Sequence, residues 1–528
     1  MKPLLLALLS LPALGFAQGA LTPPGAPAPT MKTLTQIEPR TPLQAGAPGV
    51  TANANGGFTI STSGSYYLAA NLTVASGSGI VISASDVTLD LNGFTIASIA
   101  SAASGSGIEC NGSATNIAIR NGSIRSSTTF NGTYSPGGFI NGVYNNTAAP
   151  NNSVADLSVL GVSQSGIILP GPASSVRNCR VCVCGAVGIS ASIVSDCVAL
   201  VCGNNGITAT SASNCSAESK GAGSGIAAAT VTNCSGISVS GFGISATSAT
   251  NSTGQSTSTS PGLNADTASN CRGNSTSATG LSASNAINCT GTSTEAIGLR
   301  AYCSALNSIG SSTNGIGLQA VTAENCRGSS TTSTGLYAER LATGCMGSTT
   351  SGTYGLSAVI ASNCEATNSA GRANAYGLFA SRSAVNSSGY TKTGSAGVFV
   401  GEHATGCTGS TEMGTYGLQS QGTASNCTGS VTSGANTIAE SAGLSASIVS
   451  DCSGSNNSLV AGTYGIRGTV TVNNSSGSGI IGIRATNAAN FSHGRSWASV
   501  SPVAIQAPVA IGCTSSAGAI SGTHYITP

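Results

Sequence analysis

The sequence has few charged and few aromatic residues. Of its 528 residues, 6% are charged and 4% are aromatic, with a single tryptophan, Trp497. Soluble globular domains carry about 25% charged residues, so this composition is not that of a typical enzyme core. The net charge is +2, and no cluster of lysine or arginine could neutralise an array of phosphates. The sequence therefore gives no electrostatic case for nucleic acid or an anionic membrane as a partner.

Long hydrophobic runs are missing except at the start of the chain. Residues 1–17 combine one lysine, an apolar run from Leu4 to Leu14 and small residues up to Ala17, which is the pattern of a secretory signal peptide cleaved near Ala17. No later run of about 18 apolar residues follows, so no membrane span is predicted. Residues 18–45 are proline-rich and are predicted to form a lead-in or linker. We expect a secreted or cell-surface protein.

Glycine is abundant instead, with 72 residues, and it marks an internal repeat. Within each unit the residue after this marker glycine is apolar, and the residue two further on is usually alanine, as in Leu281 and Ala283. The alternation predicts a short strand with one buried face. The sixteen marker glycines, 18 or 19 residues apart at first and then 17 to 26 apart, are Gly188, Gly206, Gly225, Gly243, Gly262, Gly280, Gly298, Gly317, Gly335, Gly355, Gly377, Gly397, Gly417, Gly443, Gly465 and Gly482.

A second buried position and a bend follow each strand. Alanine or valine stands three residues before a recurring cysteine in nearly every unit, and Asn, Asp or Gly stands immediately before it. These three residue types tolerate the left-handed backbone conformation, so we predict a tight bend between two strands. The predicted bend residues are Asn178, Asp196, Asn214, Asn233, Asn251, Asn270, Asn288, Asn307, Asn325, Gly344, Asn363, Asn386, Gly406, Asn426, Asp451 and Asn473.

The recurring cysteine is predicted to be architectural. Ser252, Ser308 and Ser387 replace it in three units and Asn474 replaces it in another, so the position requires a small inward residue more than it requires a thiol. Six cysteines fall outside this row, namely Cys110, Cys182, Cys184, Cys202, Cys303 and Cys513.

Two of these six cysteines are candidates for a disulfide. Cys184 and Cys202 each stand five residues after a cysteine of the row, in adjacent units. Alternation predicts that both point outward and stack, which favours a disulfide in an exported protein. The surrounding NCRVCVC segment also resembles part of a soft-metal site, but it lacks a fourth ligand at a familiar spacing. We therefore predict no bound metal.

A unit of 18–20 residues with three short strands predicts one coil of a parallel β-solenoid, an all-β fold in which each coil covers the next. We place this rod at residues 46–490. Residues 491–528 break the frame and contain several prolines. Because the open end of a solenoid must be covered, we predict a C-terminal cap there.

The N-terminal coils carry a family resemblance. The segments GGFTISTSGSYYLAANLTV (56–74), GIVISASDVTLDLNGFTI (79–96) and NIAIRNGSIR (116–125) resemble the opening coils of bacterial right-handed parallel β-helix proteins of the pectin-lyase-like superfamily. A stacked asparagine ladder at a two-residue bend recurs in that superfamily. The resemblance implies a single-stranded right-handed parallel β-helix, and it implies a polysaccharide lyase or glycoside hydrolase as one alternative function.

Catalytic side chains are hard to find in the repeat. The residue two after each marker glycine faces outward, and none of these residues is a carboxylate. A carboxylate pair for glycosidic chemistry stays open only in the irregular early coils, which contain Asp86, Asp90, Glu109 and Asp156. Asp86 and Asp90 fit turn and strand-end positions better. The three histidines, His403, His493 and His524, have no metal-ligand spacing, so no metal and no cofactor are predicted.

Two outward rows are candidate binding surfaces. Aromatic side chains on the first strand could stack on sugar rings or simply cover the rod; this row comprises Arg300, Gln319, Tyr337, Phe379, Phe399 and Gln419. A threonine row is typical of exposed strands and resembles the flat faces of ice-binding solenoids; it comprises Thr257, Thr276, Thr294, Thr313, Thr331 and Thr350. We therefore predict a structural, adhesive or glycan-binding surface protein whose partner is a polysaccharide or another surface protein. The alternatives are a polysaccharide-cleaving enzyme and, less favoured, ice or another flat lattice.

Overall fold

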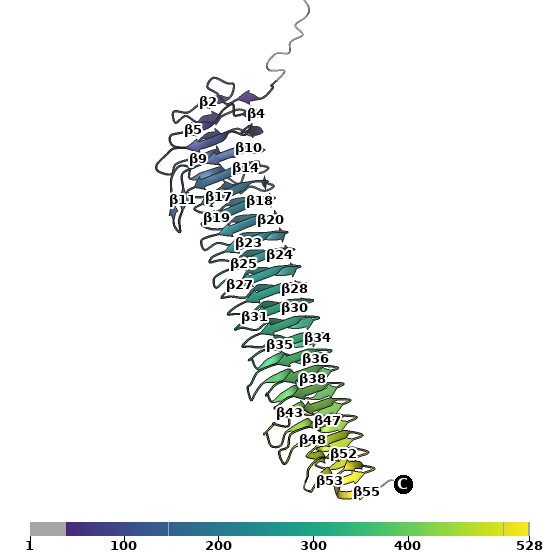
Figure 1. Cartoon of the computed structure of the whole chain (residues 1–528). Helices are drawn as coiled ribbons and strands as arrows, with labels where there is room; N and C mark the ends of the chain where they lie inside the picture. Colours follow the sequence, from purple (N-terminus) through teal and green to yellow (C-terminus); the bar gives the residue numbers. More distant parts are fainter. Residues whose placement is uncertain (1–37, 146, 500, 526–528) are drawn as a thin grey trace, which may run out of the picture.

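The computed structural model describes residues 38–145, 147–499 and 501–525. The predicted signal peptide and most of the proline-rich lead-in lie outside these residues. Within them the chain forms an elongated stack of coils from β2 at one end to β55 at the other (Figure 1). No membrane-spanning helix is found in these ranges. The predicted parallel β-solenoid is confirmed, with about 19 residues in each coil.

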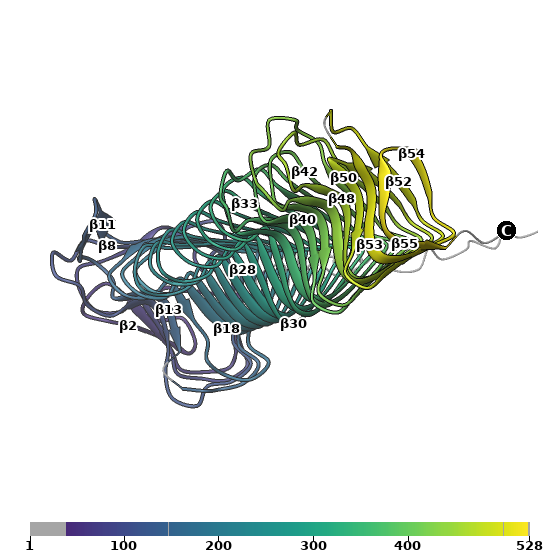
Figure 2. The same cartoon turned by 90° about the horizontal axis from the view of Figure 1, so that it is seen from below.

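The N-terminal coils are irregular, and long loops project from them (Figure 2). β2 and β3 pair antiparallel at this end of the stack, and β11 and β12 form a separate antiparallel hairpin. The strands of this part are β1 (Thr41–Pro42), β2 (Val50–Ala52), β3 (Phe58–Ile60), β4 (Gly64–Tyr67), β5 (Leu72–Val74), β6 (Ile80–Ile82), β7 (Val87–Asp90), β8 (Thr95–Ser98), β9 (Ser106–Cys110), β10 (Ala118–Arg125), β11 (Thr129–Phe130), β12 (Tyr134–Ser135), β13 (Asn141–Asn145), β14 (Ser153–Val162), β15 (Ile167–Ile168) and β16 (Ser175–Arg177).

In the regular coils, a long strand begins just after the marker glycine or up to one residue before it. Its first half forms the first face of the rod and its second half forms the second face. These strands, some of them split in two, are β18 (Ile189–Ser195), β20 (Ile207–Ser213), β22 (Ile226–Thr232), β24 (Ile244–Thr250), β26 (Leu263–Ser269), β28 (Leu281–Ile287), β30 (Leu299–Leu306), β32 (Leu318–Glu324), β34 (Leu336–Thr343), β36 (Tyr354–Ser362), β38 (Tyr376–Val385), β40 (Ala396–Val400), β41 (His403–Thr405), β43 (Tyr416–Ser420), β44 (Thr423–Ser425), β46 (Ala442–Ser450), β48 (Tyr464–Asn473), β50 (Ile481–Ala485), β51 (Ala488–Asn490), β53 (Val503–Ile511) and β55 (Ala519–Tyr525).

A short strand after the cysteine position forms the third face. These strands are β17 (Arg180–Cys184), β19 (Val198–Cys202), β21 (Ser216–Ser219), β23 (Ser235–Ser238), β25 (Thr253–Ser256), β27 (Arg272–Ser275), β29 (Thr290–Ser293), β31 (Ile309–Ser312), β33 (Arg327–Ser330), β35 (Met346–Thr349), β37 (Glu365–Asn368), β39 (Ser388–Thr391), β42 (Thr408–Thr411), β45 (Thr428–Val431), β47 (Ser453–Asn456), β49 (Ser476–Gly479), β52 (His493–Ser496) and β54 (Thr514–Ala517).

Neighbouring coils pair in parallel and in register. Leu281 of β28 lies opposite Leu263 of β26 on one side and Leu299 of β30 on the other. All three side chains are fully buried, so one apolar column runs through the inside of the first face. Ala286 continues the same pattern on the second face between Ala268 and Ala305. Stacking like on like in this way buries a continuous core that no single coil could form alone.

The predicted bend is confirmed. The bend residues have φ between 41° and 62°, the left-handed region that asparagine and glycine adopt at least cost. Side-chain amides link some of them along the rod, as where Asn288 Nδ2 donates to Asn270 Oδ1 at 3.1 Å. One prediction is wrong by a residue. The bend near the end of the rod is Asn474 rather than Asn473, and Ser475 rather than Asn474 takes the cysteine position, because Val472 pairs with Val449.

Replacing a bend asparagine tests this conformation. We expect Asn288→Ala to lower the free energy of unfolding by about 1 kcal/mol, because a Cβ disfavours left-handed backbone. Asn288→Gly should cost less, since Gly344 and Gly406 occupy the same position in other coils with φ of 61° and 62°. Urea unfolding of the two variants measures the difference, and an alanine variant as stable as the glycine variant would contradict the assignment.

The interior narrows along the rod. The inward residue of the third face is Ile124, then Val159, Val181, Ala199, Ala217 and finally Gly236 in consecutive coils. The marker glycine faces this position, and Gly142 is its equivalent in an earlier coil, because Val143 aligns through Ile167 with Ile189. A Cβ on Gly142 would lie 2.5 Å from a Val159 methyl, whereas one on Gly280 would lie 2.3 Å from the Thr292 carbonyl oxygen. As the inward side chain becomes smaller from coil to coil, the backbone of the third strand comes closer to the marker glycine. In the regular coils this approach leaves no room for a Cβ at the marker position.

The coils continue beyond residue 490. β52 pairs with β49, β53 pairs with β50 and β51, and β54 and β55 add a further layer. Cys513 is buried and follows the buried Ser492 in the next coil, so it belongs to the cysteine row and not outside it. The segment predicted to be a cap therefore begins by extending the solenoid, and a capping role for it stays a prediction.

Candidate functional site

The four acids of the early coils all have structural partners. Asp86 and Asp156 are bend residues with φ of 57° and 55°. Asp90 is 6% exposed and accepts hydrogen bonds from the Arg40 and Arg120 guanidinium groups at 3.2 and 3.3 Å. Glu109 accepts a 2.6 Å hydrogen bond from Ser78 Oγ. In the described part of the chain no three His, Cys, Asp or Glu side chains are arranged to hold a metal ion.

The six residues of the predicted aromatic row lie on one line along the first face. Arg300, Gln319 and Tyr337 are consecutive partners on β30, β32 and β34. Ser357 of β36 follows Tyr337, and the line continues through Phe379, Phe399 and Gln419 on β38, β40 and β43. The structure therefore brings these side chains together, with Ser357 as the one interruption.

The aromatic cluster is larger than the sequence predicts. Phe379 and Phe399 stack with ring centroids 5.0 Å apart and planes 6° apart. Tyr354 and Tyr376, which the prediction missed, stack on each other at 5.7 Å and contact Phe379 at 5.0 and 5.6 Å. All four rings are half-buried. They form an apolar ridge about three coils long on an otherwise polar face; we call it the aromatic ridge.

A sequence signal for the missed tyrosines exists. Tyr354 and Tyr376 stand immediately before the marker glycines Gly355 and Gly377, and Tyr416 and Tyr464 stand in the same position two and four coils further on. Burial raises the pKa of the Tyr354 hydroxyl, with a smaller contribution from Tyr376. The Tyr354 hydroxyl therefore keeps its proton and can donate a hydrogen bond at neutral pH.

Basic and amide side chains continue the line toward the C-terminus. Beyond Gln419 come Ser445, Arg467, Arg484 and Gln506. Arg484 donates a 2.5 Å hydrogen bond to the Tyr464 hydroxyl. The guanidinium carbons of Arg467 and Arg484 lie over the Tyr464 ring, at 5.8 and 5.4 Å from its centroid. Arg467 also pairs with Glu440 at 3.2 Å. Tyr464 thus holds two arginines in position on the surface.

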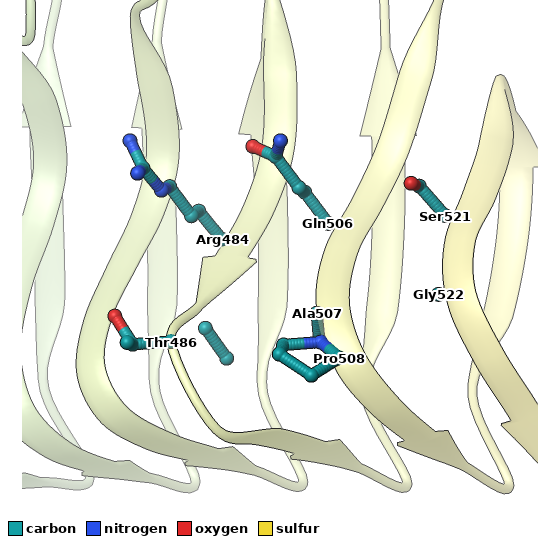
Figure 3. A pocket seen from close by; sticks show the side chains of 8 residues that line it. Arg484, Thr486, Gln506, Ala507, Pro508, Ser521 and Gly522 are labelled. Atoms are coloured by element: carbon teal, nitrogen blue, oxygen red, sulfur yellow. The ribbon is translucent and has the colours of Figure 1, made fainter.

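Two hollows lie on this part of the face. One of about 240 Å³ is lined by Tyr416, Gln419, Ser445 and Arg467, among others. The other, of about 350 Å³, is lined by residues that include Arg484, Gln506 and Ser521, whose side chains follow one another on successive strands (Figure 3). Both hollows are shallow and rich in hydrogen-bonding groups, which suits a polar polymer better than a compact apolar ligand.

The threonine row is exposed but does not lie on a strand. Thr257, Thr276, Thr294, Thr313, Thr331 and Thr350 each come directly after a short strand of the third face. The chain turns there, so the hydroxyls follow an edge of the rod rather than a flat face. A hollow of about 270 Å³ beside this edge is lined by serines and threonines, including Ser329, Thr331, Ser348 and Thr350.

The orientation predicted for the paired cysteines is wrong. Cys184 and Cys202 are opposite each other in register, as predicted, but both are fully buried. Val183 and Val201 adopt φ of 58° and 56°, and this left-handed residue resets the alternation so that the next side chain turns inward. The structure holds both as free thiols, so their disulfide stays a prediction.

No protein-family model matches the sequence, and no curated protein is similar to it. Solved structures that are similar in shape include the following two proteins. A mannuronan C-5 epimerase A-module of Azotobacter vinelandii has 11% sequence identity and a TM-score of 0.21, over 88% of this chain and 91% of the module. A GH87 alpha-1,3-glucanase catalytic domain has 11% identity and a TM-score of 0.17, over 70% of this chain and 60% of that domain.

Proposed function

We propose that the rod is a polysaccharide-binding surface protein and that a glycan chain lies along the first face, from Tyr337 to Arg484. The observation that carries the proposal is the aromatic ridge, which lies in register with a line of amide and guanidinium groups. Coils repeat about every 4.8 Å, so an extended polymer parallel to the rod would meet one side chain of the line in each coil. Aromatic rings pack against the apolar faces of sugars, and amides and guanidinium groups bind hydroxyls.

A binding role fits the face better than a catalytic one. Glycosidic chemistry requires two carboxyl groups about 5 to 9.5 Å apart across the scissile bond. The line from Arg300 to Gln506 contains no carboxylate, and the carboxylates beside it have partners: Glu440 pairs with Arg467, and Glu339 accepts from Gln319 at 3.3 Å. We therefore propose a surface that holds a glycan without cleaving it.

Removing the ridge tests the proposal. Phe379→Ala combined with Phe399→Ala should weaken binding to the best polysaccharide on a glycan array by at least about tenfold, because each ring contributes about 1 kcal/mol beyond its buried area. Tyr390→Ala is the matched control, since Tyr390 is a half-buried aromatic in the same region but on the third face. Equal losses in the two variants, or undiminished binding by the double variant, would contradict the proposal.

A further inference from the structure

A ladder of buried thiols runs beside the bend residues. In-register pairing of the third-face strands stacks the cysteine positions of successive coils. Ser252, Ser308 and Ser387 divide the ladder into separate runs. The uninterrupted runs are Cys179, Cys197, Cys215 and Cys234; Cys271 and Cys289; Cys326, Cys345 and Cys364; and Cys407, Cys427 and Cys452.

Backbone N–H groups donate hydrogen bonds to some of these sulfur atoms. The amide of Cys215 donates to Cys234 Sγ at 3.4 Å, and the amide of Cys427 donates to Cys452 Sγ at 3.3 Å. Each thiol in turn donates to the carbonyl two residues before it, as Cys345 does to Thr343 at 3.3 Å. A thiolate at Cys234 or Cys452 would therefore keep an N–H donor inside a buried site.

The coil spacing favours a bridging ion over a disulfide. Stacked side chains in register are about 4.8 Å apart, whereas a disulfide takes a Cβ to Cβ separation of about 3.8 Å and brings the sulfurs to about 2.05 Å. An ion held between two thiolates by bonds of about 2.3 Å separates the sulfurs by about 4.6 Å. Soft ions such as Cu⁺ select thiolate ligands. Because no three ligand side chains converge among the described residues, only a two-coordinate site fits.

Two of the adjacent thiol pairs line hollows on the surface of the rod. Cys215 and Cys234 line a hollow of about 590 Å³ that also contains Asp196. Cys427 and Cys452 line another of about 410 Å³ that contains Asp451. Each hollow thus combines two cysteines with asparagines and a carboxylate that attracts a cation.

We propose that adjacent thiols of the ladder bind soft monovalent metal ions, one ion between two sulfurs. Two S–H bonds break, two metal–sulfur bonds form, and both protons pass to solvent. The oxidation state of the metal does not change, and each site changes from two neutral thiols and a cation to a bis-thiolate with a charge of −1. This binding is independent of the proposed glycan surface, which lies on the first face.

Two cysteine variants in one run of three test the adjacency requirement. The full chain, under reducing conditions, is loaded with Ag⁺, freed of excess ion and weighed by native mass spectrometry. Cys364→Ser leaves Cys326 and Cys345 adjacent, so the number of bound ions should stay unchanged. Cys345→Ser removes the same number of thiols but separates Cys326 from Cys364, so one ion should be lost. Serine is tolerated in both cases, since the ladder already contains it.

A variant that adds a binding site shows that the ion lost by Cys345→Ser is not lost through unfolding. Ser308 accepts a 3.1 Å hydrogen bond from the Cys289 amide in the same way as a cysteine of the ladder. Ser308→Cys joins the run of two to the run of three, which makes six consecutive thiols, and one additional ion should bind. Equal losses in the two cysteine variants, no gain in Ser308→Cys, or no retention of Ag⁺ by the unaltered chain would each overturn the proposal.

Discussion

Replacing Gly280 by alanine should lower the free energy of unfolding by about 3 kcal/mol. A Cβ at this position would lie 2.3 and 2.4 Å from the Thr292 oxygen and nitrogen and 2.6 Å from the Gly298 oxygen. Thr292 lies in β29, which is paired on both sides, and the Gly298 oxygen, just before β30, accepts from the Leu281 amide, so none of the three atoms can move without disturbing the adjacent coils. We expect loss of amide protection in hydrogen exchange to centre on β28 and β29 and to extend to their neighbours.

The control for Gly280 is Thr292→Val. Thr292 is half-buried and points outward from the third strand at the point of closest approach. This change removes the hydrogen bond that Thr292 Oγ1 donates to Asn274 Oδ1, so it should cost no more than about 1 kcal/mol. If Gly280→Ala were as stable as the control, the close approach of the two strands would be wrong.

Replacing Leu281 by alanine should also lower the free energy of unfolding by about 3 kcal/mol, in this case because side-chain volume is removed from the core. Leu281 is fully buried in the apolar column of the first face, between Leu263 and Leu299. Removing its methyl groups leaves a cavity that the paired strands cannot close. Differential urea unfolding of the full chain measures the loss.

Leu281→Ile is the matched variant, because isoleucine occupies the same column at Ile189, Ile207, Ile226 and Ile244. It should cost less than about 1.5 kcal/mol. A loss as large as that of the alanine variant would mean that the column depends on leucine's shape and not on filled volume.

The repeat could be predicted from sequence because each coil position has its own requirement. Left-handed backbone restricts the bend to Asn, Asp or Gly, and close approach restricts the marker to glycine. These two constraints recur in coil after coil, so they fix the period and the strand order. The error at Asn473 arose because two asparagines stand together at 473 and 474, and only the pairing of Val472 with Val449 shows which of them makes the bend.

The orientation of individual side chains was harder to predict. Simple alternation placed Cys184 and Cys202 outside, but valines in left-handed conformation turned them inward. A β-branched residue rarely adopts that conformation, so the sequence gives no warning of it. In the candidate site, the line from Arg300 to Gln419 was predictable from the period. The contribution of Tyr354 and Tyr376 was not, because it depends on how rings from two neighbouring columns pack across the marker glycine.

The most direct test of the account is to measure binding and cleavage together on the same polysaccharide. The full chain is incubated with the glycan that binds best on an array, and bound polymer and newly formed reducing or unsaturated ends are quantified over time. We predict stable binding that the Phe379→Ala and Phe399→Ala double variant loses, with no new chain ends. Release of chain ends by the unaltered protein but not by a first-face variant would show an enzyme and contradict the proposed function.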